Sequence, residues 1–551
     1  MSLLKNVGTI GGLTMVSRVA GMAREMIFSR VLGANAVTDA WFQAFIIPNV
    51  FRRLFAEGAF SAAFVPMFSK RLHGPGTMEE GLADARSFSN AVLSVFLPVL
   101  IALCALFELA MPGVIWLLAD KPVDPQNFDV AVDFARIMFP YIVLVSLVTL
   151  FTGMLNSVSR FAPGASFPII LNLVLIAALL GGEWLIANRG YDMVDVTYGV
   201  AWAVTFGGVI QLAWLFYWTR VEGFRPRLMW PQITPEVKRL SIIALPAAIG
   251  GGAYQINTLV QLYFLNQIGS GSVSYMNYAD RLNQLPLGII GIALSTAILP
   301  TLSRFVGAKN TEGANRVQSD AIELSMLLTI PAAVALAICA TPFITMIFQG
   351  GRFSMEDAAA AGAVLGVLVL GLPAYVLVKV LVPNFYARSD TRTPVYAAFI
   401  SLAVFISTSL WNIGFSLGGP VAIFGAELTL PRLDLAPLGY GVAGIAAASV
   451  IGAWINVAFL YAVLVKRGYY AVPLPLVGRI ARQLVAAAAM GAALWFTRDL
   501  LTGWFSAGLF ARLGALAALV AAAAVVYFGV AFAVGAIDKQ RIQSLTKKKA
   551  P

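Results

Sequence analysis

The segment SAAFVPMFSK, residues 61–70, recurs as STAILPTLSR at residues 295–304. Both segments have serine, alanine and proline at matching positions, and both end on a basic residue. A second pair, GVAWAVTFGGVIQLAWL at 199–215 and GIAAASVIGAWINVAFL at 444–460, follows in the same order. Two matches in order indicate a duplicated unit with a longer loop in its second copy, and segment 418–439 is such a loop.

The composition is that of a membrane protein. Apolar residues make up 59% of the 551 residues and charged residues only 12%. Soluble domains usually carry about twice that charged fraction, and the apolar runs reach the roughly 20 residues that a spanning helix needs. We therefore predict an all-α, polytopic membrane protein. The N-terminal segment has Arg18, Arg24 and Glu25 where a signal peptide would be apolar, so we interpret it as a retained first helix.

Hydropathy, with glycine, proline and charge clusters as boundaries, predicts fourteen membrane spans. They are 7–32, 37–68, 87–111, 131–158, 163–186, 196–219, 238–268, 272–302, 318–348, 357–386, 394–417, 440–465, 478–502 and 511–535.

The basic residues indicate the orientation. Most Lys and Arg residues outside the spans fall in the segments that this count places on the same side as the N-terminus. Because short cytoplasmic loops are rich in Lys and Arg, we expect an even number of spans with both termini in the cytoplasm. This topology accounts for the net charge of +11 without a nucleic-acid partner.

The duplication predicts the domain organisation. Residues 1–227 form one six-helix bundle, residues 228–468 form a second in the same orientation, and residues 469–551 add two helices and a basic tail. Two such bundles place a cleft at their interface, where secondary transporters bind their cargo.

The chain lacks the residues of other function classes. Cys104 and Cys339 lie in apolar runs and His73 is the only histidine, so we expect no disulfide, metal site or cofactor. No G-x-x-x-x-G-K-[ST] phosphate loop occurs. We expect a transporter without a catalytic or ATPase site, driven by an ion gradient, the membrane potential or the downhill flow of its cargo.

Four arginines within the predicted spans suggest an anionic cargo. A charged side chain in a spanning helix usually faces a wet cavity or a partner. Arg18, Arg24, Arg52 and Arg281 outnumber the acids in reach, which are Glu25, Asp39 and Asp280. Guanidinium groups suit phosphate oxygens, so we predict that these arginines bind an anionic head group.

Other charges in the spans have structural alternatives. Arg30 and Arg136 lie near span ends, where their side chains can reach the interface. Arg53 and Glu57 are four residues apart, and both an ion pair and a substrate site remain open for them. Asp280 adjoins Arg281 and can pair with it in the same way.

The last two predicted spans contain LVAAAAMGAALWF (484–496) and ALAALVAAAAVVYFGVAFAV (515–534). Small residues leave room either for close helix packing or for a shallow apolar groove. If the cargo has a lipid tail, this groove is a place to hold it.

Three stretches carry a family resemblance. They are residues 14–66, which contain NVFRRLFAEGAF, then SYMNYADRLNQLPLGIIGIALSTAILPTLS (274–303) and VKVLVPNFYARSDTRTPV (378–395). They closely resemble the MurJ/MviN family of bacterial lipid II flippases, within the multidrug/oligosaccharidyl-lipid/polysaccharide exporter superfamily, and the resemblance extends over the whole chain.

The resemblance implies a function and a set of residues. The cargo would be lipid II, the undecaprenyl-diphosphate-linked disaccharide-pentapeptide, moved from the inner to the outer leaflet of the bacterial cytoplasmic membrane for peptidoglycan synthesis. The head group would be held by Arg18, Arg24, Arg52 and Arg281, with Asp39 and Lys379 as further site residues. Glu25 departs from the aspartate more usual in the family. The spacing of the residues, apart from the resemblance, makes Glu25, Arg53, Glu57 and Asp280 candidate ion-pair or gate residues.

The resemblance does not identify a coupling ion. It implies lipid II and membrane lipids as partners, but it does not say which peptidoglycan synthesis proteins act with them. A cation-coupled multidrug exporter on the same scaffold, which we expect to use a cavity acid, is the alternative function. A third possible function is a scaffold for the cell-wall machinery that transports nothing.

Overall fold

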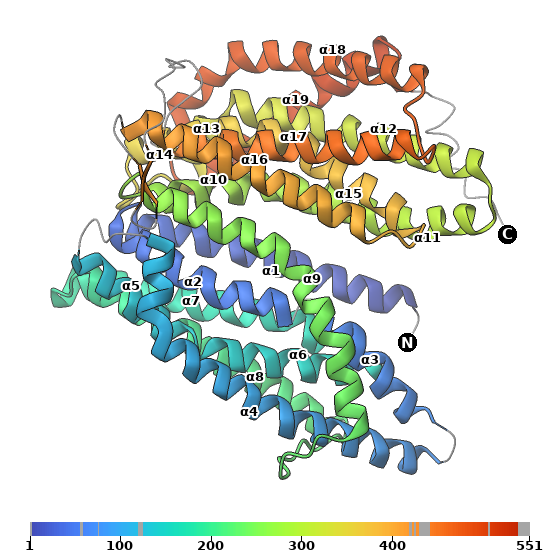
Figure 1. Ribbon diagram of the computed structural model, residues 1–551. Helices are drawn as coiled ribbons and strands as arrows, with labels where there is room; N and C mark the ends of the chain where they lie inside the picture. The colour runs from blue at the N-terminus through green and yellow to red at the C-terminus, as the bar shows by residue number, and fades with distance from the viewer. Residues whose placement is uncertain are drawn as a thin grey trace. The chain divides into compact units, whose positions relative to one another are not determined.

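The computed structural model describes residues 3–55, 59–74, 77–119, 125–417, 421–423, 426–428, 441–504 and 507–537, and within these residues it is almost entirely helical (Figure 1). The chain forms two compact units. Unit 1 comprises residues 1–274 and 350–353, and unit 2 comprises residues 275–349 and 354–551.

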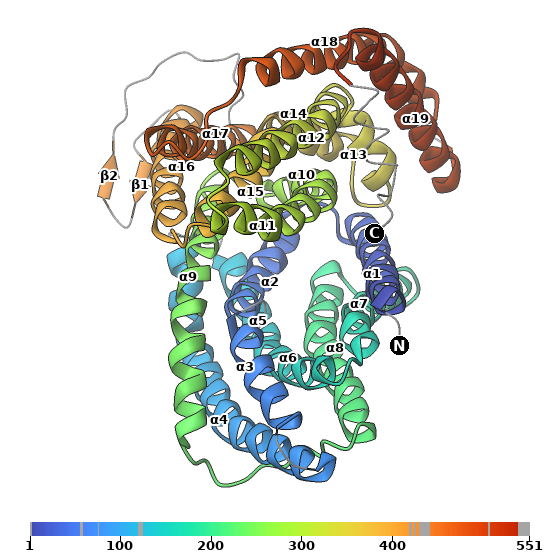
Figure 2. The ribbon, with the colours of Figure 1, turned by 90° about the vertical axis from the view of Figure 1, so that its right-hand side faces the viewer.

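Unit 1 holds the first nine helices. They are α1 (Leu3–Leu32), α2 (Ala36–Phe55), α3 (Ala59–Leu72), α4 (Met78–Ala119), α5 (Pro125–Met138), α6 (Tyr141–Ser157), α7 (Phe161–Arg189), α8 (Met193–Val221) and α9 (Pro235–Asn266). Helix α7 packs between α1 and α8, and α9 packs along α3 and α4 (Figure 2).

The remaining elements lie in unit 2, except that the first residues of α10 belong to unit 1. They are α10 (Ser272–Pro286), the π-helical turn η1 (Leu287–Gly291), α11 (Ile292–Gly307), α12 (Thr311–Ile338), α13 (Ala340–Phe348), α14 (Met355–Leu368), η2 (Val369–Gly371), α15 (Leu372–Tyr386), α16 (Arg392–Leu417), β1 (Val421–Ile423), β2 (Ala426–Leu428), α17 (Val442–Lys466), α18 (Leu474–Thr497), η4 (Arg498–Trp504) and α19 (Leu509–Ala533). Strands β1 and β2 form a short antiparallel hairpin.

Each of the fourteen predicted spans coincides with one helix or with consecutive helices. Within the described residues, eleven helices are long and apolar enough to cross a membrane. The predicted spans outside these eleven are 7–32, 37–68 and 238–268, which correspond to α1, to α2 with α3, and to α9. The polytopic all-α fold is confirmed, and the number fourteen stays a prediction.

The two halves of the chain repeat their packing. The first pair of matching segments lies in α3 and α11, and the second lies in α8 and α17. Helix α3 packs against α4 and α6 as α11 packs against α12 and α15, and α8 packs against α7 as α17 packs against α16. Sequence duplication has therefore given equivalent helix neighbours.

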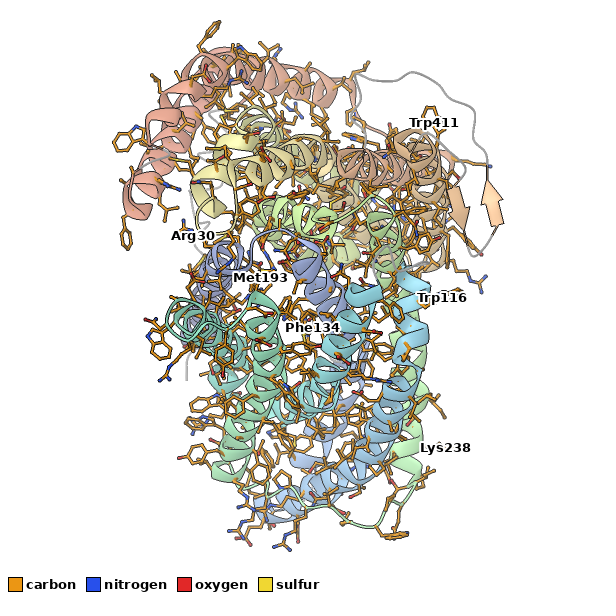
Figure 3. The ribbon with its side chains drawn as sticks, turned by 90° about the vertical axis from the view of Figure 1, so that its left-hand side faces the viewer. Arg30, Trp116, Phe134, Met193, Lys238 and Trp411 are labelled. Atoms are coloured by element: carbon orange, nitrogen blue, oxygen red, sulfur yellow. The ribbon has the colours of Figure 1, made fainter. Side chains whose placement is uncertain are left out.

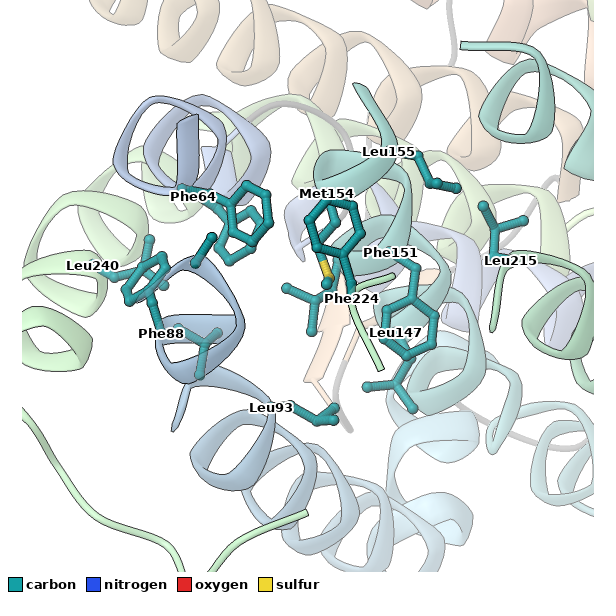
Figure 4. Close-up of a cluster of buried hydrophobic side chains, with 14 of the residues drawn as sticks. Phe64, Phe88, Leu93, Leu147, Phe151, Met154, Leu155, Leu215, Phe224 and Leu240 are labelled. Carbon is teal, nitrogen blue, oxygen red and sulfur yellow. The ribbon is translucent and has the colours of Figure 1, made fainter. Parts of the chain in front are cut away.

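The core of unit 1 is aromatic. Phe64 of α3 stacks on Phe68 of the same helix and on Phe88 of α4, and Phe224 from the segment after α8 meets the edge of Phe68. Figure 4 shows Phe64, Phe88 and Phe224 in this cluster. These rings are almost completely buried. Aromatic side chains stabilise a core through their large buried area and their ring contacts, so this cluster joins three parts of unit 1.

The C-terminal end of α1 is capped by a distant turn. A helix leaves its last four carbonyl groups without helical partners. Here the Arg30 and Val31 carbonyls accept hydrogen bonds from the Arg352 backbone N–H (2.8 Å) and side chain (2.7 Å). The Arg352 side chain also pairs with Glu183 of α7 at 2.8 Å. Turn 350–353 therefore ties α1 to α7, and this explains why it belongs to unit 1.

Helix α9 opens the second predicted bundle, 228–468. In the structure α9 packs against α2, α3 and α4 and is counted in unit 1. The predicted boundaries 1–227, 228–468 and 469–551 stay a prediction.

Close packing between α7 and α8 gives a stability prediction. A Cβ atom on Gly182 would lie 2.3 Å from Cγ1 of buried Val196, whereas one on the neighbouring Gly181 would meet nothing within 4 Å. We expect Gly182→Ala to destabilise the protein by about 1–3 kcal/mol through overpacking. Thermal unfolding of the detergent-solubilised protein measures the effect, with Gly181→Ala as the matched control. Equal melting temperatures for the two variants would refute this packing.

Candidate functional site

Arg24 is the most enclosed of the predicted site arginines. It lies on α1 and is 8% exposed. Its guanidinium forms an ion pair with Glu25 and donates a hydrogen bond to Oδ1 of Asn172 on α7 at 3.1 Å. Asn172 in turn donates to the Ser17 carbonyl at 3.3 Å. This network holds the guanidinium in a fixed position between α1 and α7.

Glu25 provides the local counter-charge for Arg24. It is 2% exposed, so its carboxylate is taken out of water almost completely. A buried carboxylate is costly unless a cation and hydrogen bonds compensate it. The structure therefore places Glu25, predicted as an ion-pair or gate residue, in an ion pair with Arg24.

Arg18 lies further back on α1, and its side chain is exposed. It makes no ion pair with any acid in the described part of the chain. Gly21 stands between Arg18 and Arg24, and a Cβ there would contact the Asn172 side chain at 3.6 Å. Helices α1 and α7 thus approach closely beside both arginines.

Arg52 lies on α2 and is partly buried. Its Nε donates to Oδ1 of Asn49, one turn earlier, at 3.2 Å. Unit 1 therefore carries Arg52 on α2 and Arg24 on α1, two different helices.

The structure describes the backbone of Arg53 as part of α2 but not the Arg53 side chain, and Glu57 lies outside the described residues. The choice between an ion pair and a site stays open for both.

Asp39, in the first turn of α2, is buried and accepts three hydrogen bonds. The donors are the backbone N–H of Gly271 (2.6 Å), the backbone N–H of Ser274 (2.8 Å) and the Ser274 hydroxyl (2.5 Å). These N–H groups belong to the start of α10, where a helix lacks internal acceptors and favours negative charge. The structure gives this carboxylate a capping role at α10.

Unit 2 carries Asp280, Arg281 and Lys379. The Asp280 carboxylate accepts hydrogen bonds from Gln284, one turn later, and from Asn283 at 3.4 Å. Lys379 on α15 has its Cδ atom 3.1 Å from the Cβ that a side chain at Gly291 would have, so its stem crosses the π-helical turn η1. Arg281 is partly buried on α10, the helix that leads into this turn.

Unit 2 also contains an apolar pocket of about 190 Å³. Its walls come from α12, α13, α18 and α19, and include Leu328, Ala335, Met490, Ala524 and Phe528. Part of segment 478–535, where the sequence suggested either packing or a groove, therefore lines a hollow.

Comparison with known proteins identifies the family. Residues 28–516 match the family described as Lipid II flippase MurJ. A protein of Rhizobium meliloti (strain 1021) named Probable lipid II flippase MurJ is 40% identical over 554 residues, covering 100% of this chain and 97% of its own. The chain belongs to the MurJ family. Another relative, Lipid II flippase MurJ of Burkholderia cenocepacia, is 33% identical over 97% of this chain and 98% of its own.

Solved structures agree with the MurJ fold. A structure described as Lipid II flippase MurJ in an inward closed conformation matches with a TM-score of 0.72 and 23% identity, over 97% of this chain and 99% of its own. An inward-facing multidrug resistance MATE family transporter of the MOP superfamily matches with a TM-score of 0.62 and 14% identity, over 84% and 98%. At these identities the structures show the fold alone.

Two polar residues of this MurJ-family chain were missed by sequence reasoning. Asn172 stands alone in the apolar run FPIILNLVLIAALL (167–180), which is a usable signal because a lone amide in a spanning helix needs a partner. Ser274, in the first turn of α10, offers no comparable signal. Its partner Asp39 is 235 residues away in sequence.

Proposed function

We propose that this chain is a lipid II flippase of the bacterial cytoplasmic membrane. It moves the undecaprenyl-diphosphate-linked peptidoglycan precursor from the inner to the outer leaflet, and both of its termini lie in the cytoplasm. The observation that carries the proposal is the 40% identity to a named MurJ relative over the whole length of a chain that carries Arg18 and Arg24 on α1 and Arg52 on α2.

The head group binds the arginines through its diphosphate. Arg24 forms an ion pair with Glu25, while Arg18 on the same helix and Arg52 on α2 add positive charge. Charge-assisted hydrogen bonds from guanidinium groups to phosphate oxygens are short and strong. Arg281, Lys379 and Asp39 are further proposed residues of the head-group site, on the strength of the family resemblance.

Transport follows an alternating-access cycle. The head group enters from the cytoplasm, the two bundles rock to close that side, and release follows on the other side while the tail stays in lipid. The inside-negative membrane potential acts on the positive site with about 2.3 kcal/mol per charge per 100 mV. We propose the potential or a coupling ion as the energy source, with no catalytic or ATPase site and no bound cofactor.

Part of the prenyl tail contacts the apolar pocket formed by α12, α13, α18 and α19, while the rest of the tail stays in lipid. Ala524 lines this pocket, whereas Ala522 is exposed and does not line it. The phenyl ring of an Ala524→Phe variant would displace about two methylene groups of the prenyl tail from the pocket, which removes roughly 1.6 kcal/mol of apolar burial. We therefore expect this variant to slow translocation of lipid II about tenfold. Reconstituted transport with full-length and short-tailed lipid II measures the effect, and Ala522→Phe is the control. Equal slowing of both substrates would contradict a role in tail binding.

The alternative is a cation-coupled multidrug exporter on the same scaffold, since a MATE transporter has a similar fold. Proteoliposomes loaded with fluorescent lipid II separate the two functions. We expect the purified chain to move lipid II across the bilayer and to leave typical cationic drugs in place. Drug efflux without lipid movement would overturn the proposal, and movement of neither would favour a scaffold.

Complementation provides a check in cells. We expect the gene to restore growth of a flippase-depleted bacterium and an Arg24→Ala variant to fail. Growth rescued by that variant would count against Arg24 as an essential contact of the head group.

A further inference from the structure

The segment between α8 and α9 is fixed against α4. Nε of Arg86 donates to the Gly223 carbonyl at 2.7 Å, the Arg227 N–H donates to Asn90 Oδ1 at 2.9 Å, and the Met229 N–H donates to Ser94 Oγ at 2.7 Å. Phe224 is fully buried in the aromatic core. The segment has no helix or strand between α8 and α9, yet its backbone is held in one path across the end of unit 1 (Figure 2).

This path presents three arginines around one hollow. Arg220, Arg225, Pro226 and Arg227 line a pocket of about 240 Å³, and all three guanidinium groups belong to exposed residues. Arg225 has a positive φ of 46°, a conformation that costs a residue with a side chain about 1 kcal/mol or more. The backbone is therefore strained at Arg225, one of the residues that line the pocket.

Within the described part of the chain, no acid lines the pocket. The nearest acid in sequence, Glu222, pairs with Arg160 at 2.7 Å. Lys238 and Arg239 follow at the start of α9, and Figure 3 shows Lys238 at this end of unit 1. Guanidinium groups gathered in a pocket repel one another unless an anion joins them.

Large apolar side chains flank the arginines. Leu228, Trp230 and Ile233 are 64%, 86% and 77% exposed. Tryptophan in membrane proteins gathers at the level of the lipid head groups, and exposed apolar residues beside basic ones mark a surface that lies in the interface. A free soluble anion would use the arginines but would not need these residues.

We propose that this arginine pocket binds the phosphate of an anionic glycerophospholipid in the cytoplasmic leaflet, with Trp230 and Ile233 against the glycerol and acyl region. Clusters of basic residues beside a membrane span recognise such lipids. The inference rests on the predicted orientation of the α8–α9 segment and is independent of the flippase proposal.

Native mass spectrometry of the detergent-solubilised full chain tests this site. The ligands are phosphatidylglycerol and phosphatidylcholine with identical acyl chains. We expect preferential retention of phosphatidylglycerol, and an approximately tenfold loss of that binding in Arg225→Gln/Arg227→Gln. The matched control, Arg304→Gln/Lys309→Gln, removes two exposed charges at the end of α11 and retains the lipid.

A second variant identifies the occupant. Trp230→Ala/Ile233→Ala keeps the arginines, and we expect it to weaken phosphatidylglycerol binding while inorganic phosphate competes poorly with the lipid in the wild type. Unchanged binding in the double arginine variant would overturn the site, and equal retention of phosphatidylcholine would overturn the charge requirement. Efficient displacement by inorganic phosphate, with no effect of the Trp230 variant, would show a soluble-anion site instead.

Discussion

Arg24→Met is expected to cost both stability and transport. The substitution leaves the Glu25 carboxylate, 2% exposed, without its cation and removes the hydrogen bond to Asn172. Breaking a buried ion pair by removing one partner destabilises a protein by about 3–5 kcal/mol. We expect a lower melting temperature and lipid II translocation below about one tenth of the wild-type rate, since one lost charged contact is worth more than 1.4 kcal/mol.

The double variant Arg24→Met/Glu25→Gln separates these two effects. It removes both charges, so the unpaired carboxylate is gone and most of the stability should return. Translocation should remain low because the guanidinium that binds the diphosphate is still missing. Wild-type transport by a stable double variant would mean that Arg24 serves only to neutralise Glu25.

Asp39→Ala is expected to have the second largest effect. The substitution removes the acceptor for two N–H groups at the start of α10 and for the Ser274 hydroxyl. Hydrogen bonds to a charged group are each worth about 1.5–3 kcal/mol, so the loss should reach about 3 kcal/mol and lower transport with it. Ser274→Ala removes one of the three hydrogen bonds and should cost less.

Thermal unfolding and translocation should both be measured for this pair. If Asp39 acts through α10, both quantities fall together and Ser274→Ala gives an intermediate value for each. Full thermal stability combined with lost transport in Asp39→Ala would contradict the capping role and favour direct contact with the cargo.

The repetition and hydropathy of the sequence were sufficient to predict the fold. The matching segments lie in helices with equivalent neighbours, and they share small residues at several matching positions, such as Gly199 with Gly444 and Gly207 with Gly452. Helix breaks within spans were not predicted. The π-helical turn at Leu287–Gly291 interrupts a run whose hydropathy is continuous.

The partners of the site residues could not be predicted from sequence. Arg24 and its hydrogen-bond partner Asn172 are 148 residues apart in the sequence, and Asp39 and its partner Gly271 are 232 residues apart. Periodicity identifies which residues share a helix face, but it does not say which helix lies opposite that face. The roles of Arg18, Arg52, Arg281 and Lys379 in binding the head group accordingly stay predictions, which experiments on single residues test.

Translocation of fluorescent lipid II in proteoliposomes, measured for Arg18→Ala, Arg52→Ala and Arg281→Ala, tests the central claim most directly. Arg316→Ala is the control, because Arg316 is an exposed residue in a surface ion pair with Glu312. We predict that each of the three variants folds, with an unchanged melting temperature, and translocates lipid II at less than about one tenth of the wild-type rate. Undiminished translocation in all three variants would contradict recognition of the diphosphate by these arginines.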